Sequence, residues 1–178
     1  AADRVRERDA RLAAARALHG AWKAWPINDL VEVRAIEQLL AAAQLSTGPE
    51  RSELAREAMD WSMALVASRG TARALRIAAS AAEARASIEP SPATWLVAFD
   101  CWSAVIPLDP QGMFPRWRAA EAAEQAGRIA DAVTQFERVL EIDRNLVHDP
   151  RKQLTAAQRE AIEQRLERLR GAAEESAP

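Results

Sequence analysis

The sequence has few of the residues on which disulfide-rich, metal-binding and membrane-spanning proteins depend. A single cysteine, Cys101, cannot form a disulfide within the chain, and we expect a buried thiol rather than a nucleophile. The only histidines, His19 and His148, have no second ligand at metal-site spacing, so we predict no metal and no cofactor. No apolar run approaches the roughly 20 residues that span a bilayer.

Glycine is also scarce, with six residues, and tyrosine is absent, whereas alanine is abundant. Alanine loses no side-chain entropy in a helix, and no stretch alternates strictly enough to predict a strand. The 24 basic and 26 acidic residues nearly balance, so we expect neither a nucleic acid nor an anionic membrane as a partner. The chain begins without methionine, which we interpret as a sign that it is part of a longer protein.

A pattern recurs after 34 residues in the second half of the chain. AFDCWSAVIPLDP (98–110) and AVTQFERVLEIDR (132–144) share a small, an aromatic, a β-branched and an acidic residue at the same spacing. In the second copy, Ala132, Phe136 and Val139 lie on one helix face, which a single helical hairpin cannot bury alone. A partial third copy lies upstream around Trp61. The recurrence therefore predicts hairpins stacked on one another.

Breaks in the apolar pattern predict seven to eight helices in an all-α fold of antiparallel hairpins. We expect N-caps at Asn28, Thr71 and Ser91, and a capping box at Thr155–Gln158. The first helix should end near Gly20 and carry Val5 on its apolar face, and the second should carry Leu30. A single domain, 1–178, would contain an N-terminal helical pair (1–45), degenerate repeats (49–110), the best repeat (111–144), a capping helix (155–171) and a frayed tail (172–178).

AEAAEQAGRIADAVTQFERVLEIDRN (120–145) resembles a tetratricopeptide repeat. The residues that match the repeat pattern are Ala120, Gly127 at the turn, Ala132, Phe136, Val139 and Asp143. Three residues depart from the pattern. Tyrosine is common at the position of Ala123 and proline at that of Arg144, and Trp117 lies one place from the usual tryptophan. The resemblance implies an α-solenoid that binds extended peptides on a concave surface lined by the first helix of each hairpin.

Residues 108–166 also resemble the C-terminal end of bacterial O-antigen ligase-like proteins, including the segment DPRKQL (149–154). This resemblance implies the soluble, extracytoplasmic part of a membrane protein in envelope polysaccharide assembly; a cytoplasmic location is the alternative. The ligase chemistry of that family belongs to its membrane region. We therefore expect no catalytic residue and no enzyme activity in this segment.

The candidate ligand-binding residues are basic and aromatic side chains on the expected concave face: Arg73, Arg76, Arg85, Arg116 and Trp117. Arginine binds carboxylates and anionic sugars through its planar guanidinium. We expect the partner to be a protein or a peptide segment, and envelope glycan is a second candidate ligand. The alternative is a glycan-binding or glycan-processing domain with a tryptophan-lined groove. A shallow groove of helix-face residues would favour the first hypothesis, and a deep pocket with two carboxylates and an exposed tryptophan the second.

Overall fold

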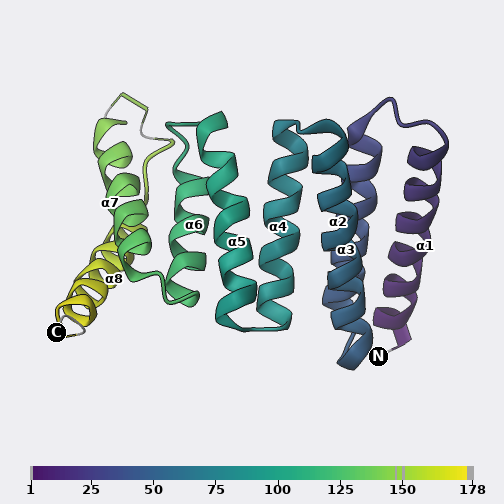
Figure 1. Cartoon of the computed structure of the whole chain (residues 1–178), viewed down its shortest axis with the longest axis horizontal. Helices are drawn as coiled ribbons and strands as arrows, with labels where there is room; N and C mark the ends of the chain where they lie inside the picture. The colour runs from purple at the N-terminus through teal and green to yellow at the C-terminus, as the bar shows by residue number, and fades with distance from the viewer. Residues whose placement is uncertain (1, 147, 150, 176–178) are drawn as a thin grey trace. The chain divides into compact units, whose positions relative to one another are not determined.

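The computed structural model describes residues 2–146, 148–149 and 151–175 (Figure 1). Within these residues there are eight α-helices, one short 3₁₀ helix and no β-strand, so the predicted all-α class is confirmed. In the same part of the chain, no helix combines the length and apolar content that crossing a bilayer requires.

The chain forms two compact units, Ala1–Thr94 and Trp95–Pro178. Unit 1 contains helices α1 (Ala2–Ala24), α2 (Asp29–Leu45), α3 (Gly48–Arg69) and α4 (Ala72–Ile88). Helix α5 (Pro92–Val105) begins at the end of unit 1 and lies mostly in unit 2, which continues with η1 (Ile106–Leu108), α6 (Met113–Gln125), α7 (Ile129–Asn145) and α8 (Ala156–Glu175).

Side-chain caps fix the beginnings of four helices where the sequence predicts them. Asn28 accepts a hydrogen bond from the Leu30 amide, and Thr71 accepts one from the Ala74 amide. The Ser91 hydroxyl likewise accepts from the Thr94 amide at 3.1 Å. The predicted capping box forms as well: the Thr155 amide donates to Gln158 at 2.9 Å, and the Gln158 amide donates back to the Thr155 hydroxyl at 3.3 Å.

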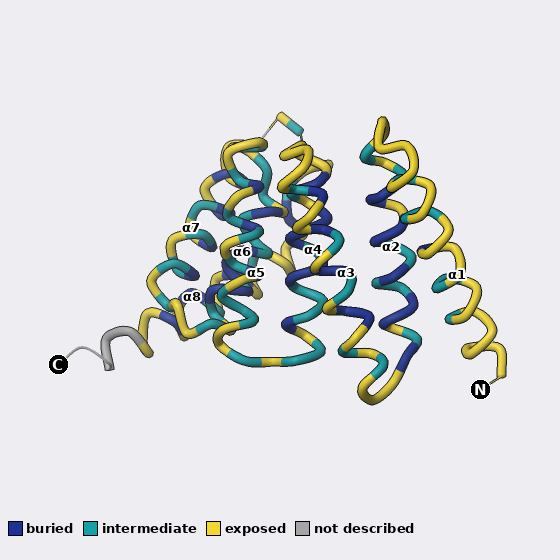
Figure 2. Tube along the Cα trace, turned by 45° about the vertical axis from the view of Figure 1, so that its right-hand side comes forward, coloured by how far each residue is buried: buried dark blue, intermediate teal, exposed yellow. Residues whose placement is uncertain are grey.

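Unit 1 is built from helices that contact both their sequence neighbours and the next helix but one. Helix α2 packs against α1, α3 and α4, and α3 packs against α4. Contact between alternate helices is what stacked hairpins produce. Figure 2 shows the buried residues on the facing sides of these helices. The largest apolar side chains buried at this core are Ile36, Leu39 and Leu65.

In unit 2, α7 packs against both α6 and α8. Of the four pairs of residues that recur after 34 positions, three occupy equivalent buried places there, whereas in the acidic pair Asp143 is buried and Asp109 is half-buried. Three pairs are buried on both members: Ala98 and Ala132, Trp102 and Phe136, and Val105 and Val139. The prediction that this face is core rather than surface is therefore confirmed.

Three predicted details of the helices are wrong, each for a local reason. Helix α1 passes Gly20 and ends at Ala24, because an internal glycine costs a helix only about 1 kcal/mol whereas Pro26 disfavours helical backbone just before it. Leu30 is exposed because it lies about 120° around α2 from the buried Ile36. Val5 is exposed, and this end of α1 is held by a polar contact instead, because the Arg4 guanidinium donates to the last carbonyls of α2.

The last helix, α8, is longer than predicted. It continues to Glu175, four residues beyond the expected end of the capping helix. The rest of the predicted frayed tail, 176–178, lies outside the described residues.

Candidate functional site

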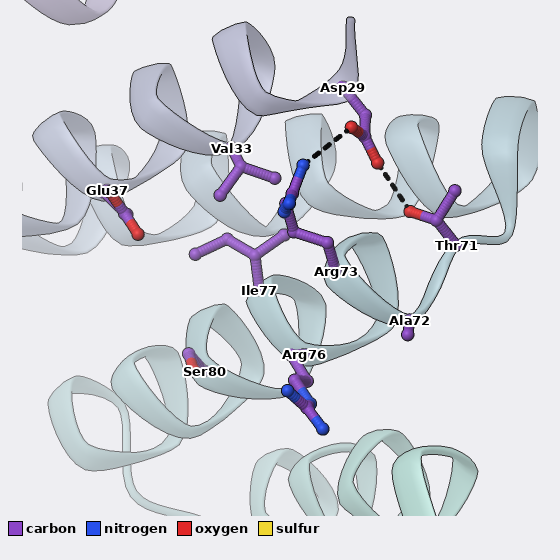
Figure 3. A pocket seen from close by; sticks show the side chains of 9 residues that line it. All are labelled: Asp29, Val33, Glu37, Thr71, Ala72, Arg73, Arg76, Ile77 and Ser80. Atoms are coloured by element: carbon purple, nitrogen blue, oxygen red, sulfur yellow. Dashed lines mark hydrogen bonds and ion pairs between the residues drawn. The ribbon is translucent and has the colours of Figure 1, made fainter. Parts of the chain in front are cut away.

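A groove of about 550 Å³ lies between α2 and α4 in unit 1 (Figure 3). Its floor is apolar, because Val33 of α2 and Ile77 of α4 face each other between the two helices. Around this floor lie two hydroxyls, two carboxylates and two guanidinium groups. The polar residues that line the groove are Asp29, Glu37, Thr71, Arg73, Arg76 and Ser80.

One end of the groove is fixed by contacts between the beginnings of the two helices. The Thr71 hydroxyl donates to Asp29 Oδ2 at 2.7 Å, and Arg73 Nη1 lies 3.2 Å from Asp29 Oδ1. Asp29 is the first residue of α2, and Thr71 is the N-cap of α4. The Asp29 carboxylate therefore joins α2 to α4. Its negative charge also interacts favourably with the positive end of the α2 helix dipole.

Arg73 is half exposed, with 53% of its side chain accessible, whereas Asp29 is 17% accessible. An ion pair with a half-exposed partner contributes at most about 1 kcal/mol, because water screens it. Glu37 on the opposite side of the groove is paired with Arg34 at 2.7 Å, and both of these side chains are exposed. The two carboxylates of the groove are thus compensated, but by exposed contacts that an incoming ligand can replace.

Only two of the five predicted ligand-binding residues lie together. Arg73 and Arg76 both line the groove. Arg85, on the last turn of the same helix, instead faces Glu89 at 3.5 Å, and Glu89 is also paired with Arg56.

The other two predicted residues, Arg116 and Trp117, belong to α6 in unit 2. Arg116 donates to the Gln135 side chain at 3.1 Å and to the Pro110 carbonyl at 3.2 Å. Burial lowers the pKa of its guanidinium, and the neighbouring Arg138 adds to this effect. Trp117 is half-buried and packs against the unit 2 core.

Sequence reasoning missed the acidic partner in the groove. Thr71 was identified only as a cap, and Asp29 was not singled out. The pairing was missed because 42 residues and a whole helix separate the two side chains. The available signal was weak: an acidic residue in the first turn of a helix is common whether or not it has a distant partner.

A second polar cluster was also missed, and it is buried. His19 Nδ1 of α1 lies 2.7 Å from Glu32 Oε1 of α2, and the Glu32 side chain is only 1% accessible. The sequence contained a signal here: Glu32 precedes Ile36 and Leu39 by four and seven residues, which places a carboxylate on the apolar face of α2.

The described residues hold no cluster of three histidine, cysteine or acidic side chains arranged to bind a metal ion. Burial raises the pKa of the Cys101 thiol, and Asp100 raises it further, which disfavours the reactive thiolate.

No protein-family model matches the chain, and no curated protein sequence matches it significantly.

Proposed function

We propose that the chain is a protein-interaction module whose α2–α4 groove binds an extended peptide segment bearing a carboxylate. The observation that carries this proposal is the composition of the groove: an apolar floor, hydroxyls on its walls and two arginines on one helix. Hydroxyl groups donate to or accept from a peptide backbone, while guanidinium groups orient an acidic side chain or a chain terminus. A pocket for a small apolar molecule needs deeper enclosure than a surface groove provides.

The arrangement of charges supports an acidic ligand in particular. Arg73 already binds a carboxylate, that of Asp29, in a half-exposed pair. A ligand carboxylate beside Arg73, and a second acidic group beside Arg76, would gain charge-assisted hydrogen bonds, each contributing about 1 kcal/mol at these exposed side chains. Asp29 would keep its hydrogen bond from Thr71, so the exchange leaves no buried group without a partner.

The alternative, a glycan-binding or glycan-processing domain, has less support. Two carboxylates line the groove, but each is held by an arginine, and no tryptophan lines it. Trp25 is 72% exposed, yet it lies on the loop between α1 and α2 and does not line the groove. Sugar binding in protein grooves depends on an aromatic face beside hydrogen-bonding groups.

The proposal is tested with the full chain and three nine-residue peptides built on a glycine–serine backbone: one acidic, one neutral and one basic. We expect the acidic peptide alone to shift the amide NMR signals of Asp29–Glu37 and of Thr71–Ser80. Replacing both Arg73 and Arg76 with alanine should weaken this binding about 30-fold, since two charge-assisted contacts of about 1 kcal/mol each are lost.

Arg85→Ala is the matched control, because Arg85 lies on the same helix and carries the same charge but does not line the groove. This variant should bind the acidic peptide as the unaltered chain does. Equal weakening by Arg85→Ala would reduce the effect to general charge attraction. Binding of the acidic peptide outside α2 and α4 would contradict the proposed site.

We further propose that the module is tetratricopeptide-like and belongs to an extracytoplasmic part of an O-antigen ligase-like protein. Support for the repeat class comes from the alternate-helix contacts of unit 1 and the buried 34-residue pairs of unit 2. The envelope context rests on the resemblance of residues 108–166 alone; Pro150 of its DPRKQL segment lies outside the described residues. A multi-span hydrophobic region encoded directly upstream of residue 1 would support it, and a cytosolic start there would overturn it.

A further inference from the structure

Helix α1 is held to the rest of unit 1 with little apolar burial. Of its residues, Ala15 alone is buried, while Leu12 and Trp22 are partly buried against the core. Figure 2 shows most of the α1 trace in the colour of exposed residues. Because α1 itself buries few apolar side chains, its polar contacts add a large part of what keeps it docked, beside the apolar face of α2 that it covers.

Most of those polar contacts are exposed ones. Arg4 donates to carbonyls at the end of α2, Arg8 pairs with Glu50 and Arg16 pairs with Glu57. Contacts of this kind each contribute about 1 kcal/mol or less, because water competes for both partners.

The contact between His19 and Glu32 differs from these because it is buried and joins three helices. The His19 imidazole of α1 accepts from or donates to Glu32 of α2 at 2.7 Å. Its ring lies parallel to the Trp61 ring of α3, with centroids 3.7 Å apart. Undocking of α1 would break both contacts and would also uncover the apolar face of α2.

The cluster is incompletely satisfied. Among the described residues, Glu32 Oε2 and the indole Nε1 of Trp22 are buried without a hydrogen-bond partner. A buried carboxylate with an unpartnered oxygen is costly when ionised, whereas a carboxylic acid hydrogen-bonded to a neutral imidazole carries no net charge.

The surrounding charges do not remove this cost. On α1, Arg16 and Lys23 act on His19, and Lys23 also acts on Glu32. On α3, Glu57 is engaged by Arg16; on α2, Asp29 is engaged by Arg73 of α4 and by Thr71. The pair is therefore the main titrating group at the interface of α1 with α2 and α3.

We propose that α1 is a detachable cover of unit 1, held in place by a proton shared between His19 and Glu32. With that proton the buried pair is neutral overall. Without it the docked helix would bury a net negative charge, and with a second proton a net positive one.

The pKa shifts of Glu32 and His19 show how the stability of the docked helix changes as the pH rises or falls. Burial raises the pKa of Glu32 from 4.5 to about 7, so the docked state loses stability as the pH rises from 4.5 through 7. Burial, with Lys23 and Arg16, lowers the pKa of His19 from 6.5, so the docked state loses stability as the pH falls below 6.5. The two effects on the docked state oppose each other up to about pH 7, and the loss at Glu32 is the larger one above 6.5.

Hydrogen exchange of the full chain tests the proposal, with each rate divided by its intrinsic rate so that protection is compared across pH. Protection of α1 should fall about twofold as the pH rises from 6.5 to 8, because the roughly fourfold loss at Glu32 is partly offset at His19, while that of α4 stays constant. Glu32→Gln should abolish this fall and leave only a decrease below 6.5. His19→Phe, which keeps a ring for Trp61 to stack on, should instead lose protection about tenfold or more between 4.5 and 7.

Glu50→Gln is the matched control, because it breaks the contact of α3 with Arg8 of α1, eleven residues along α1 from His19, and leaves the buried pair and its neighbouring charges intact. Its α1 protection should keep the pH dependence of the unaltered chain. The proposal is overturned if α1 protection is constant from pH 5 to 8.5, if it follows that of α4, or if Glu32→Gln retains the fall above 6.5. Should Glu32→Gln not fold, His19→Phe alone decides: an unchanged pH profile in that variant contradicts the shared proton.

Discussion

Replacing Phe136 with alanine is expected to lower the free energy of unfolding of unit 2 by about 3–5 kcal/mol. The Phe136 side chain is fully buried in the core formed by α6, α7 and α8. Its ring also lies 5.5 Å from the guanidinium carbon of Arg165, a cation–π contact that alanine removes. Urea unfolding followed by pulsed hydrogen exchange of α7 measures the change for unit 2 separately from unit 1.

Phe114→Ala is the matched control for this prediction. Phe114 belongs to the same unit and contacts the ring of Trp102 edge-on, but 65% of it is exposed. Its loss should cost about 1 kcal/mol, mainly the aromatic pair. Equal costs for the two variants would mean that the face carrying Phe136 is not the core of the unit.

Replacing Asp143 with alanine is expected to lower the free energy of unfolding of unit 2 by about 2–4 kcal/mol. The Asp143 side chain is fully buried, and it accepts the Leu154 amide at 2.6 Å on one oxygen. Its other oxygen accepts from Arg159 Nε at 2.9 Å and lies 2.7 Å from Arg159 Nη2. Alanine would leave a buried amide without an acceptor and would release the start of α8 from the end of α7.

The same urea experiment, read at the amides of α8, measures this second effect. Asp143→Asn should cost less than alanine, because an amide oxygen still accepts from Leu154 but no longer carries the charge that Arg159 pairs with. Glu137→Ala, which removes an exposed pair between α7 and Arg170 of α8, should cost at most about 1 kcal/mol. A cost for Asp143→Ala no greater than that of Glu137→Ala would show that the buried acceptor has no special role.

Local signals in the sequence predicted most helix beginnings correctly. Asn28, Thr71, Ser91 and Thr155 are all caps, because the interaction between a side-chain oxygen and an amide two or three residues ahead depends on neighbouring residues alone. The buried 34-residue pairs were also predictable, since stacking requires the same kinds of side chain at the same place in each hairpin.

The site was less predictable, because it depends on contacts between helices that are distant in the sequence. Arginine on a helix face indicates only a charged surface until its neighbours are known. Asp29 lies 44 residues from Arg73, and the same distance in sequence would suit many other pairings. Arg116 and Trp117, although of the expected residue types, lie in the other unit, where one bonds to its own loop and the next helix and the other packs on the core.

Glu32 shows a different limit. Helical periodicity gives the direction of each residue around α2, but the predicted apolar face included Leu30, which is exposed, and not Glu32, which is buried. That choice treated the carboxylate as solvent-facing, because ionisable side chains are rarely buried without a partner. The partner, His19, lies on another helix, so the rule and its exception are indistinguishable until the helices are packed.

The position of α8 restricts how a protein of this kind grows longer over evolution. Its inward residues, Ile162, Leu166 and Leu169, complete the core beside α7, while its intervening positions are mostly charged and exposed. A duplicated hairpin packed on this face of α8 would meet that charged surface rather than an apolar one. A duplicated hairpin is therefore accommodated upstream of Thr155 rather than against the charged face of α8.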